Sequence, residues 1–457
     1  MRHIIKIKKG LDIPLGGIPE REILDLRSVE RYAVKPPDVV GFTPRLCVAE
    51  GNTVSAGQPL VQDKLDERLF LPSPVSGTVE AIVRGEKRRL LEVIVCRNNQ
   101  NNQNTPSTLT PEAPVWWMIK ERPFGTIANP DHKPKGIYIS LRDTNPLAPD
   151  LDFALKGREQ EFEAGLEALC KLAPVHVCGN KPMSFHLSPL TFHLVEGPHP
   201  AGNIGTIVAA LDPINKGEYV WSVNAQDVAN IGRWCLTGEY KPERVIAVGG
   251  PAAKCPKYYR VICGASMTRI SEAQRIDPTY PSLSTFHFPL STRIISGSPL
   301  SGSTVAPNGF LGMYDQQVCF IEEGDKYDFM GWLMPGLKKF SFSQTFLSGF
   351  MGVMDKMGLM GLMGELKPSY DFNTNVHGSV RPFLFTGSFE RVFPFDIYPL
   401  QLIKACIVGD VELQEKLGIY EVEPEDFALC EFIDPSKTEI QTIIREALEV
   451  LRKEATA

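Results

Sequence analysis

The sequence lacks any C-x-x-C pair, although it contains ten cysteines in 457 residues. The closest cysteines are Cys170 with Cys178 and Cys255 with Cys263. Zinc and iron–sulfur sites usually need shorter spacings, because one turn of the chain must offer two thiolates. We therefore predict no metal site on this chain, and we expect reduced cysteines that pack as small apolar side chains.

Long apolar runs and long basic runs are also missing. No window of about 18 uninterrupted apolar residues occurs, which argues against a membrane span, and the start MRHIIKIKKGLDIP has no signal-peptide pattern. The net charge is −6, from 48 basic and 54 acidic residues. This balance, with no basic cluster, excludes a nucleic-acid partner. The length predicts several domains.

Nucleotide fingerprints are absent as well, since neither G-x-G-x-x-G nor a Walker A loop occurs. The nearest substitute is EGPHPAGNIGT (196–206). Gly202 and Gly205 permit close approach of a ligand to the backbone, and His199 is a candidate hydrogen-bond donor. A ligand-binding loop and a purely structural loop are both consistent with this stretch.

The organisation of the chain follows from one linker and several shifts of pattern. Residues 98–114 are polar with three prolines, which predicts a linker. Residues 1–97 before it combine short alternating strands with glycine turns, which indicates a small β-sandwich or barrel. After it we expect an α/β domain over 115–258, a small β-rich domain over 259–325, a connecting segment over 326–379 and a helical region over 380–457.

Strand and helix signals alternate in the expected α/β domain. Helical spacing of apolar residues predicts a helix over 158–172 and another over 226–240. Four short apolar runs read as buried strands: GIYISL (136–141), VHVCG (175–179), GTIVAAL (205–211) and RVIAVGG (244–250). In the tail, we predict a helix over 396–410. Ser436 and Glu439 have the spacing of a capping box that opens the last helix.

Residues 62–79, QDKLDERLFLPSPVSGTV, are similar to the attachment hairpin of a biotin or lipoyl carrier. Lys64 precedes a Ser-Pro-x-x-Gly turn, as a carrier lysine does. The intervening LDERLFL is longer and more charged than in carriers, and no Met flanks the lysine as at a biotin site. We interpret Lys64 as an ordinary surface residue on a carrier-like scaffold, and a carrier function remains an alternative.

A methionine recurs every third residue in SGFMGVMDKMGLMGLMGEL (348–366). Flexible methionines suit adaptable apolar contacts, and the charges at Asp355 and Lys356 exclude a membrane span. Our hypothesis is a docking segment for a membrane partner or lipid surface. A glycine-rich helix or internal loop packed on its own domain is the alternative. The candidate contact residues are Phe350, Met351, Met354, Met357, Met360 and Met363.

An ordered set of stretches along the whole chain resembles one family, the A subunit of the sodium-translocating NADH:quinone oxidoreductase (NQR). The stretches are KIKKGLDIPLGGIPE (6–20), SPVSGTVEAIVRGEKR (73–88), GPHPAGNIGT (197–206), ISGSPLSGS (295–303), GWLMPG (331–336), FERVFPFDIYPLQLIKACIVGD (389–410) and EPEDFALCEFIDPSK (423–437). Any one of them is only moderately specific, whereas their order from end to end is highly specific.

The resemblance implies a peripheral protein on the cytoplasmic side of a bacterial inner membrane, bound to the other NQR subunits and chiefly to the membrane-embedded B subunit. The complex uses NADH, flavins, an iron–sulfur centre and quinone, and it couples electron transfer to Na⁺ export. The resemblance further implies that this chain supports quinone reduction while binding no cofactor and having no independent catalytic site. Candidate contacts for a quinone are His199, Gly202, Gly205, Tyr32 and Arg45.

The resemblance also extends to the NADH-oxidising subunit of complex I and to the Rnf C subunit. It implies an N-terminal barrel-sandwich (biotinyl/lipoyl-like) domain, a Rossmann-like α/β domain, a β-grasp-type domain and a helical C-terminal domain. Cluster-bearing relatives carry C-x-x-C-x-x-C runs near the C terminus, where this chain keeps only Cys430. One thiolate cannot hold a [4Fe–4S] cluster. A flavin- and NADH-binding dehydrogenase subunit of the Rnf or complex I type is the alternative function, and the missing cysteine runs and nucleotide fingerprints count against it.

Overall fold

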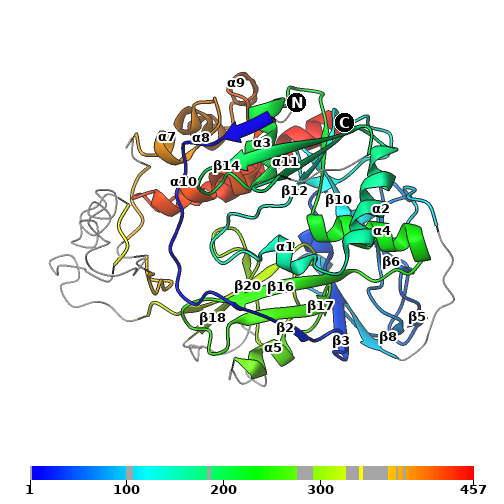
Figure 1. The fold of residues 1–457 in the computed structure, drawn as a ribbon. Helices are drawn as coiled ribbons and strands as arrows, with labels where there is room; N and C mark the ends of the chain where they lie inside the picture. The colour runs from blue at the N-terminus through cyan, green and yellow to red at the C-terminus, as the bar shows by residue number, and fades with distance from the viewer. Residues whose placement is uncertain are drawn as a thin grey trace.

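The computed structural model describes residues 3–98, 107–182, 187–274, 292–325, 339–342, 369–376, 379–383 and 387–456. These residues form four sheets, with helices packed on the sheets and further helices in the C-terminal region (Figure 1). The methionine-rich stretch, with Phe350, Met351, Met354, Met357, Met360 and Met363, lies outside the described residues.

Two small antiparallel sheets form the N-terminal sandwich, as the sequence predicts. One sheet has the order β3 (Arg31–Val34), β9 (Leu90–Arg97), β8 (Gly77–Arg84) and β5 (Thr53–Val54). The other has the order β4 (Pro44–Leu46), β6 (Pro59–Asp63) and β7 (Phe70–Pro72). Alternate apolar residues, including Val61, Leu71, Val79 and Val95, point into the shared core. Lys64 is exposed in the loop between β6 and β7, where its amide donates to Thr43 O.

The first two strands pair outside this sandwich. Strand β1 (His3–Lys6) runs parallel to β14 (Leu190–Glu196), and β2 (Glu20–Asp25) runs parallel to β17 (Lys257–Ile262). The extended chain between β1 and β2 therefore passes from one large sheet to the other (Figure 1). The N-terminal residues tie the two large sheets together.

A seven-stranded sheet forms the centre of the α/β domain, with the order β1, β14, β13 (Val175–Gly179), β12 (Ile137–Ser140), β15 (Val220–Val223), β10 (Ile119–Arg122) and β11 (Thr126–Ile127). The first five strands are parallel, and the last two pairings are antiparallel. From β12 the chain moves to one side of the sheet through β13 and β14, then crosses back to β15 on the other side. The strand order thus reverses between β12 and β15, a topological switch point.

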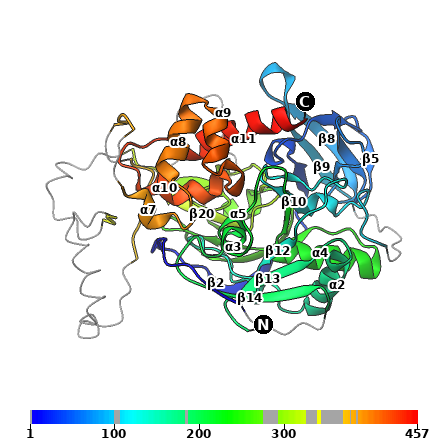
Figure 2. The same cartoon turned by 90° about the horizontal axis from the view of Figure 1, so that it is seen from above.

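Helices cover both faces of this sheet. Strand residues alternate in direction, so Ile137 and Ile139 pack with α2 (Glu159–Cys170) and α4 (Ala225–Thr237), while Tyr138 packs with α3 (Ile204–Leu211) (Figure 2). The prediction of helices over 158–172 and 226–240 is confirmed. The prediction of a strand over 205–211 is wrong, because GTIVAAL forms α3. The run is apolar even at the exposed Ala210, so it shows no polar periodicity that distinguishes helix from strand.

A second large sheet is mixed, with the order β19 (Ser303–Thr304), β18 (Thr292–Ser296), β20 (Gln317–Glu322), β16 (Glu243–Gly249), β17 and β2. Every residue of β16 is buried, which agrees with the continuous apolar run in the sequence. One helix in the described residues, α5 (Thr268–Ala273), accompanies this sheet.

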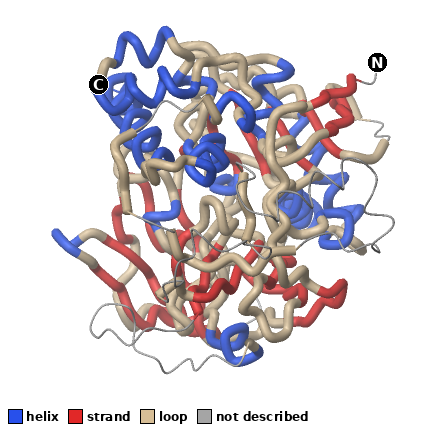
Figure 3. Tube along the Cα trace, turned by 90° about the vertical axis from the view of Figure 1, so that its left-hand side faces the viewer, coloured by secondary structure: helices blue, strands red, loops and turns tan. Residues whose placement is uncertain are grey.

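The C-terminal region is helical and has its own core. It contains α7 (Phe389–Val392), α8 (Pro399–Val408), α9 (Val411–Lys416), α10 (Ala428–Ile433) and α11 (Ile440–Thr456). These helices gather at one end of the molecule (Figure 3), around a cluster that includes Phe393, Leu402, Phe427 and Leu448. Of the helices in the described residues, none is long and apolar enough to cross a membrane.

The prediction that Ser436 and Glu439 open the last helix with a capping box is wrong, because the helix begins after both residues. Helix α11 begins at Ile440, one residue after Glu439, and Lys437 has a positive φ of 61° that breaks the expected first turn. The Glu431 side chain instead accepts from the Gln441 amide at 2.8 Å. A tertiary contact from α10 therefore replaces the local cap.

Helices α2 and α4 cross so closely that only glycine fits at the contact. A Cβ at Gly232 would lie 1.7 Å from Glu161 O, and a Cβ at Gly165 would lie 2.0 Å from Val228 O. We predict that Gly232→Ala lowers the free energy of unfolding by about 1–3 kcal/mol, because the helices must separate. Urea denaturation measures this change.

The control is Gly217→Ala, at a position with φ of +82° and no atom within 4 Å of the added Cβ. It introduces backbone strain without a clash. A Gly232→Ala variant as stable as the parent would show that the α2–α4 crossing tolerates a methyl group.

Candidate functional site

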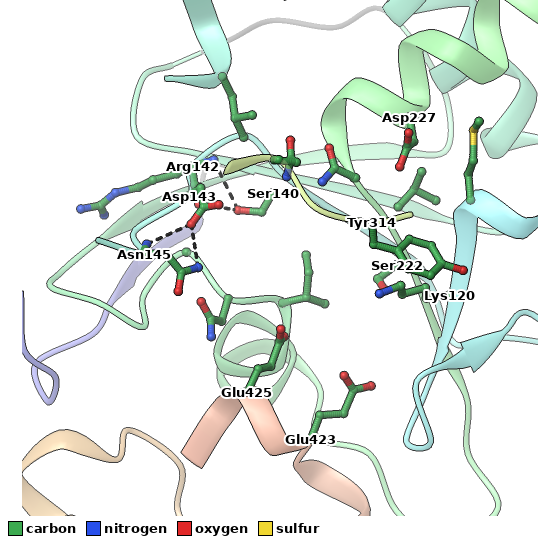
Figure 4. Close-up of a pocket in the computed structure, with 18 of the residues that line it drawn as sticks. Lys120, Ser140, Arg142, Asp143, Asn145, Ser222, Asp227, Tyr314, Glu423 and Glu425 are labelled. Carbon is green, nitrogen blue, oxygen red and sulfur yellow. Dashed lines mark hydrogen bonds between the residues drawn. The ribbon is translucent and has the colours of Figure 1, made fainter. Parts of the chain in front are cut away.

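A cavity of about 250 Å³ lies at the carboxyl ends of β12 and β15. In open α/β sheets, ligands bind in the crevice at this point of strand reversal. The walls come from strand β10, the loop after β12, the end of β15, the starts of α3 and α4, the segment before β20, and residues 423–425 of the C-terminal region. Figure 4 shows charged and polar side chains converging on the open space from these walls.

The loop after β12 forms a hydrogen-bonded polar wall. Asp143 Oδ1 accepts from both the amide and the side-chain nitrogen of Asn145, each at 2.9 Å. Enclosure by protein raises the pKa of Asp143. Arg142 points away from this pair and donates to Val195 O at 3.0 Å and to Gly197 O at 2.7 Å. Arg142 therefore fixes the glycine loop rather than offering a free charge.

Strand β10 contributes a lysine with no carboxylate within ion-pair distance in the described part of the chain. Lys120 Nζ lies 3.7 Å from the centre of the Tyr314 ring. Burial lowers the pKa of Lys120, and the charges of Glu423 and Glu425 oppose that effect. A desolvated ammonium facing a cavity is a strong hydrogen-bond donor for a ligand.

Two residues further along β10, Arg122 is buried among three carboxylates. Its Nη2 donates to Asp426 Oδ2 at 2.7 Å. Its Nη1 lies 3.6 Å from Glu423 Oε2 and 3.9 Å from Glu425 Oε1. Burial by itself lowers the pKa of Arg122, but the three carboxylates outweigh it and raise that pKa. A single arginine cannot neutralise three carboxylates, so one of them is driven to hold a proton.

Glu425 is the carboxyl group that holds this proton most readily. Enclosure in the cavity, followed by the charges of Asp426 and Glu423, raises its pKa to about 7. Its side chain remains 47% exposed because it projects into the open space (Figure 4). Glu425 therefore exchanges protons with water near neutral pH.

Asp227, which lines the cavity at the start of α4, has its charge neutralised by an ion pair with Arg244. Asp227 Oδ2 lies 2.6 Å from Arg244 Nη2, and both side chains are almost fully buried. Arg244 also donates to Met313 O. Asp227 is thus an anchor between α4 and β16 rather than a free ligand group. No group of three or more His, Cys, Asp or Glu side chains suited to a metal ion occurs among the residues that the structure describes.

The glycine loop predicted from the sequence borders the cavity. Gly202 lines it, and its amide donates to Thr144 Oγ1 at 3.0 Å. His199 is only 1% exposed, with Nδ1 at 3.1 Å from the same Thr144 oxygen. Burial lowers the pKa of His199 to about 4, so its ring is neutral. Gly205 lies in the first turn of α3 against Asp426.

Tyr32 and Arg45 lie in the N-terminal sandwich, on its two different sheets. Tyr32 is fully buried on β3, and its hydroxyl donates to Arg27 O at 2.8 Å. Arg45 projects from β4 and lies 2.8 Å from Glu67 Oε1. Neither residue lines the cavity that the described residues form. The five predicted ligand contacts are therefore not gathered in one place.

Sequence reasoning missed the charged residues of the cavity: Lys120, Arg122, Asp143, Glu423, Glu425 and Asp426. A signal existed for Asp143, because polar residues directly follow the predicted strand 136–141. A signal also existed for Lys120 and Arg122, since WWMIKERPFG places charges within an aromatic and apolar stretch. Nothing in the sequence linked either stretch to EPED, about three hundred residues away.

The fold and the cavity define an α/β protein with a ligand crevice at a sheet switch point, closed by a helical C-terminal region. Comparisons with known proteins identify the family. The model of the NqrA N-terminal barrel-sandwich hybrid domain matches residues 5–98, and that of the NqrA second alpha/beta domain matches residues 104–240.

Relatives of similar length match from end to end. The chain is 34% identical to the A subunit of Na(+)-translocating NADH-quinone reductase from Pasteurella multocida, over 99% of this chain and 100% of that protein. It is 35% identical to the same protein of Histophilus somni and 34% identical to that of Neisseria meningitidis, with the same coverage. The chain belongs to the NqrA family, the A subunits of Na(+)-translocating NADH-quinone reductases, which confirms the resemblance found in the sequence.

We predict that Glu425→Gln changes how stability depends on pH. The unfolded chain releases the Glu425 proton near the ordinary pKa of 4.5, whereas the folded chain keeps it up to about pH 7. The folded state therefore binds more protons in this window, and stability falls as pH rises through it. The variant lacks this loss, so it is more stable than the parent at pH 8 and nearly equal to it at pH 5.

Exposure of Glu425 to solvent keeps the difference to about 1 kcal/mol or less. Urea midpoints at the two pH values measure it, with Glu412→Gln on the exposed face of α9 as the control. If Glu425→Gln and the parent lose stability equally between pH 5 and pH 8, the Glu425 carboxyl does not hold the proton.

Proposed function

We propose that this chain is a peripheral subunit of a complex that transfers electrons from NADH to quinone and exports Na⁺. It supports the quinone-reduction step, binds the other subunits of the complex, and docks chiefly on the membrane-embedded B subunit. The observation that carries the proposal is end-to-end similarity to the A subunits of Na(+)-translocating NADH-quinone reductases. We place it on the cytoplasmic side of the bacterial inner membrane, as the resemblance implies.

We also propose that NADH, the flavins and the iron–sulfur centre are bound by other subunits. Cys430, the one cysteine in the segment where cluster-bearing relatives carry several, is fully buried in the C-terminal core. Burial raises the pKa of Cys430 well above its usual value, so its sulfur is a thiol and not the thiolate that a cluster requires. This environment supports a structural role for Cys430.

Where this chain contacts the quinone, we propose the cavity at the ends of β12 and β15. A quinone ring needs an apolar surface and donors to its carbonyl oxygens. The cavity offers Leu151 and Val223 as apolar wall, and Lys120 and Ser222 as donors. By contrast, the donors of Tyr32 and Arg45 are already hydrogen-bonded or ion-paired within the sandwich. Of the predicted contacts, Gly202 and its neighbour Gly205 remain candidates at this place.

Omission of the chain from the complex tests the proposal. Inverted membrane vesicles, in which Na⁺ export is measured as uptake, should lose quinone-linked NADH oxidation and Na⁺ uptake by about tenfold or more when prepared from cells that lack this chain. Oxidation of NADH by ferricyanide should continue, because that acceptor takes electrons before the quinone step. Spectrophotometric assays of the two activities in the same membranes measure the contrast.

Re-expression of the full chain is the control, and it should restore both quinone-linked NADH oxidation and Na⁺ uptake. Quinone reduction that continues at the parental rate without the chain would contradict the proposal. A purified chain with flavin absorbance would instead support the dehydrogenase alternative.

A further inference from the structure

Two ionisable side chains, Lys120 and Glu425, point into the cavity from different walls (Figure 4). Lys120 lies on β10, and Glu425 lies on the turn Pro424–Phe427 of the C-terminal region. Arg122, two residues after Lys120, comes within 3.9 Å of Glu425. Strand residues two apart are separated by about 7 Å, and Lys120 forms no ion pair with Glu425 in the described residues. The two groups are therefore neighbours with open space between them.

Both side chains keep unused hydrogen-bonding capacity. Lys120 Nζ lies 3.7 Å from the centre of the Tyr314 ring and donates to no acceptor in the described part of the chain. The nearest cation to the Glu425 carboxyl is Arg122 Nη1 at 3.9 Å, which is too far for a hydrogen bond. Asp227 differs, because Arg244 already neutralises it. Lys120 and Glu425 are thus the groups that a ligand in the cavity can engage.

The surroundings of Glu425 favour its protonated form near neutral pH. The charged groups that line or border the cavity around it are Glu423 and Asp426 from its own turn, Lys120 and Arg122 from β10, Arg142 and Asp143 after β12, and Asp227 from α4. Enclosure, followed by the charges of Asp426 and Glu423, raises the pKa of Glu425 to about 7, although Arg122 and Lys120 oppose the shift. A large share of the molecules therefore carries a proton on Glu425 at pH 7.

A quinone has the chemistry that these two groups require. It carries two carbonyl oxygens at opposite ends of a flat ring, and both oxygens are acceptors. The Lys120 ammonium and the protonated Glu425 carboxyl are both donors, so each can bind one carbonyl oxygen. Leu151 and Val223 supply apolar surface for the ring in the same cavity.

We propose that Glu425 protonates the quinone during its reduction and that Lys120 holds the opposite carbonyl oxygen, an inference that rests on the proposed function. A reduced cofactor of another subunit supplies two electrons, and each quinone oxygen gains one proton. The O–H bond of Glu425 breaks as an O–H bond forms on the quinone, and water reprotonates the half-exposed carboxylate. The Lys120 ammonium stabilises negative charge on the other oxygen until water protonates it.

Glu425→Gln in the assembled complex tests the proton transfer, with NADH as electron donor and ubiquinone-1 as acceptor. Glutamine keeps a donor for the carbonyl oxygen but has no proton to transfer. We expect kcat to fall about tenfold or more at pH 6, with KM little changed. The parent loses the Glu425 proton as pH rises through about 7. Its kcat should therefore fall toward that of the variant by pH 8, whereas the variant lacks this decline.

Lys120→Met in the assembled complex tests the positioning role. Methionine keeps an unbranched apolar side chain beside Tyr314 but removes the charged donor. We expect KM for ubiquinone-1 to rise about tenfold or more, because hydrogen bonds from charged groups are the strong ones. Lys120→Arg keeps a charged donor and should recover most of this loss. Steady-state rates over a range of quinone concentrations separate KM from kcat.

The matched controls are Glu412→Gln and Lys416→Met. Both residues lie on the exposed face of α9, so these variants remove the same groups away from the cavity. Their kcat, KM and pH profiles should equal those of the parent. Immunoblots of the membranes measure how much of each variant chain is assembled, and rates are expressed per assembled chain. Oxidation of NADH by ferricyanide should be the same in all variants.

A parental pH profile in assembled Glu425→Gln, or a parental KM in assembled Lys120→Met, overturns the proposal. Either result leaves the proposed function intact if omission of the whole chain still abolishes quinone reduction. If Lys120→Met does not assemble, Lys120→Gln takes its place, because glutamine also removes the charge. Should neither lysine variant assemble, the pH profile of Glu425→Gln decides alone.

Discussion

A single buried charge, the guanidinium of Arg122, links the α/β sheet to the C-terminal region. It lies at the end of β10 with only 3% of its side chain exposed, and its closest partner is Asp426 from the C-terminal region. Removing one partner of a buried ion pair leaves an uncompensated charge, which costs about 3–5 kcal/mol. The Arg122–Asp426 pair joins β10 of the α/β sheet to the C-terminal region. The cavity between them has walls from both, and its shape depends on this contact.

The Arg122–Asp426 contact also determines which groups face the cavity. The cavity lies at the sheet switch point, where the first turn of α3 packs against Asp426 from the C-terminal region. The remaining open space carries Lys120 and the proton-exchanging Glu425, on walls more than three hundred residues apart in sequence. The C-terminal region thus forms one wall of the cavity at the sheet switch point.

The sequence predicted the elements whose signals are local. Helices α2 and α4 show amphipathic spacing, and β13 and β16 are short apolar runs between polar turns. Helix α3 was missed because its exposed side carries Ala210 rather than a polar residue, so no polar face reveals its period. The last helix was placed too early because its start depends on Glu431, a tertiary contact. Loop 196–206, which the sequence offered as either a ligand-binding or a structural loop, borders the cavity. Its charged neighbours could not be predicted, because Arg122 and Asp426 meet only in the fold.

The most direct test of the Arg122 contact is hydrogen–deuterium exchange of the full chain and its Arg122→Gln variant. If Arg122 holds the C-terminal region against the sheet, amides in α8, α10 and α11 should exchange faster in the variant, because local opening of that region becomes easier. Amides in α2 and α4 should keep their parental rates. Unchanged exchange throughout α8, α10 and α11 would show that the C-terminal helices are held by other contacts, and would contradict the account.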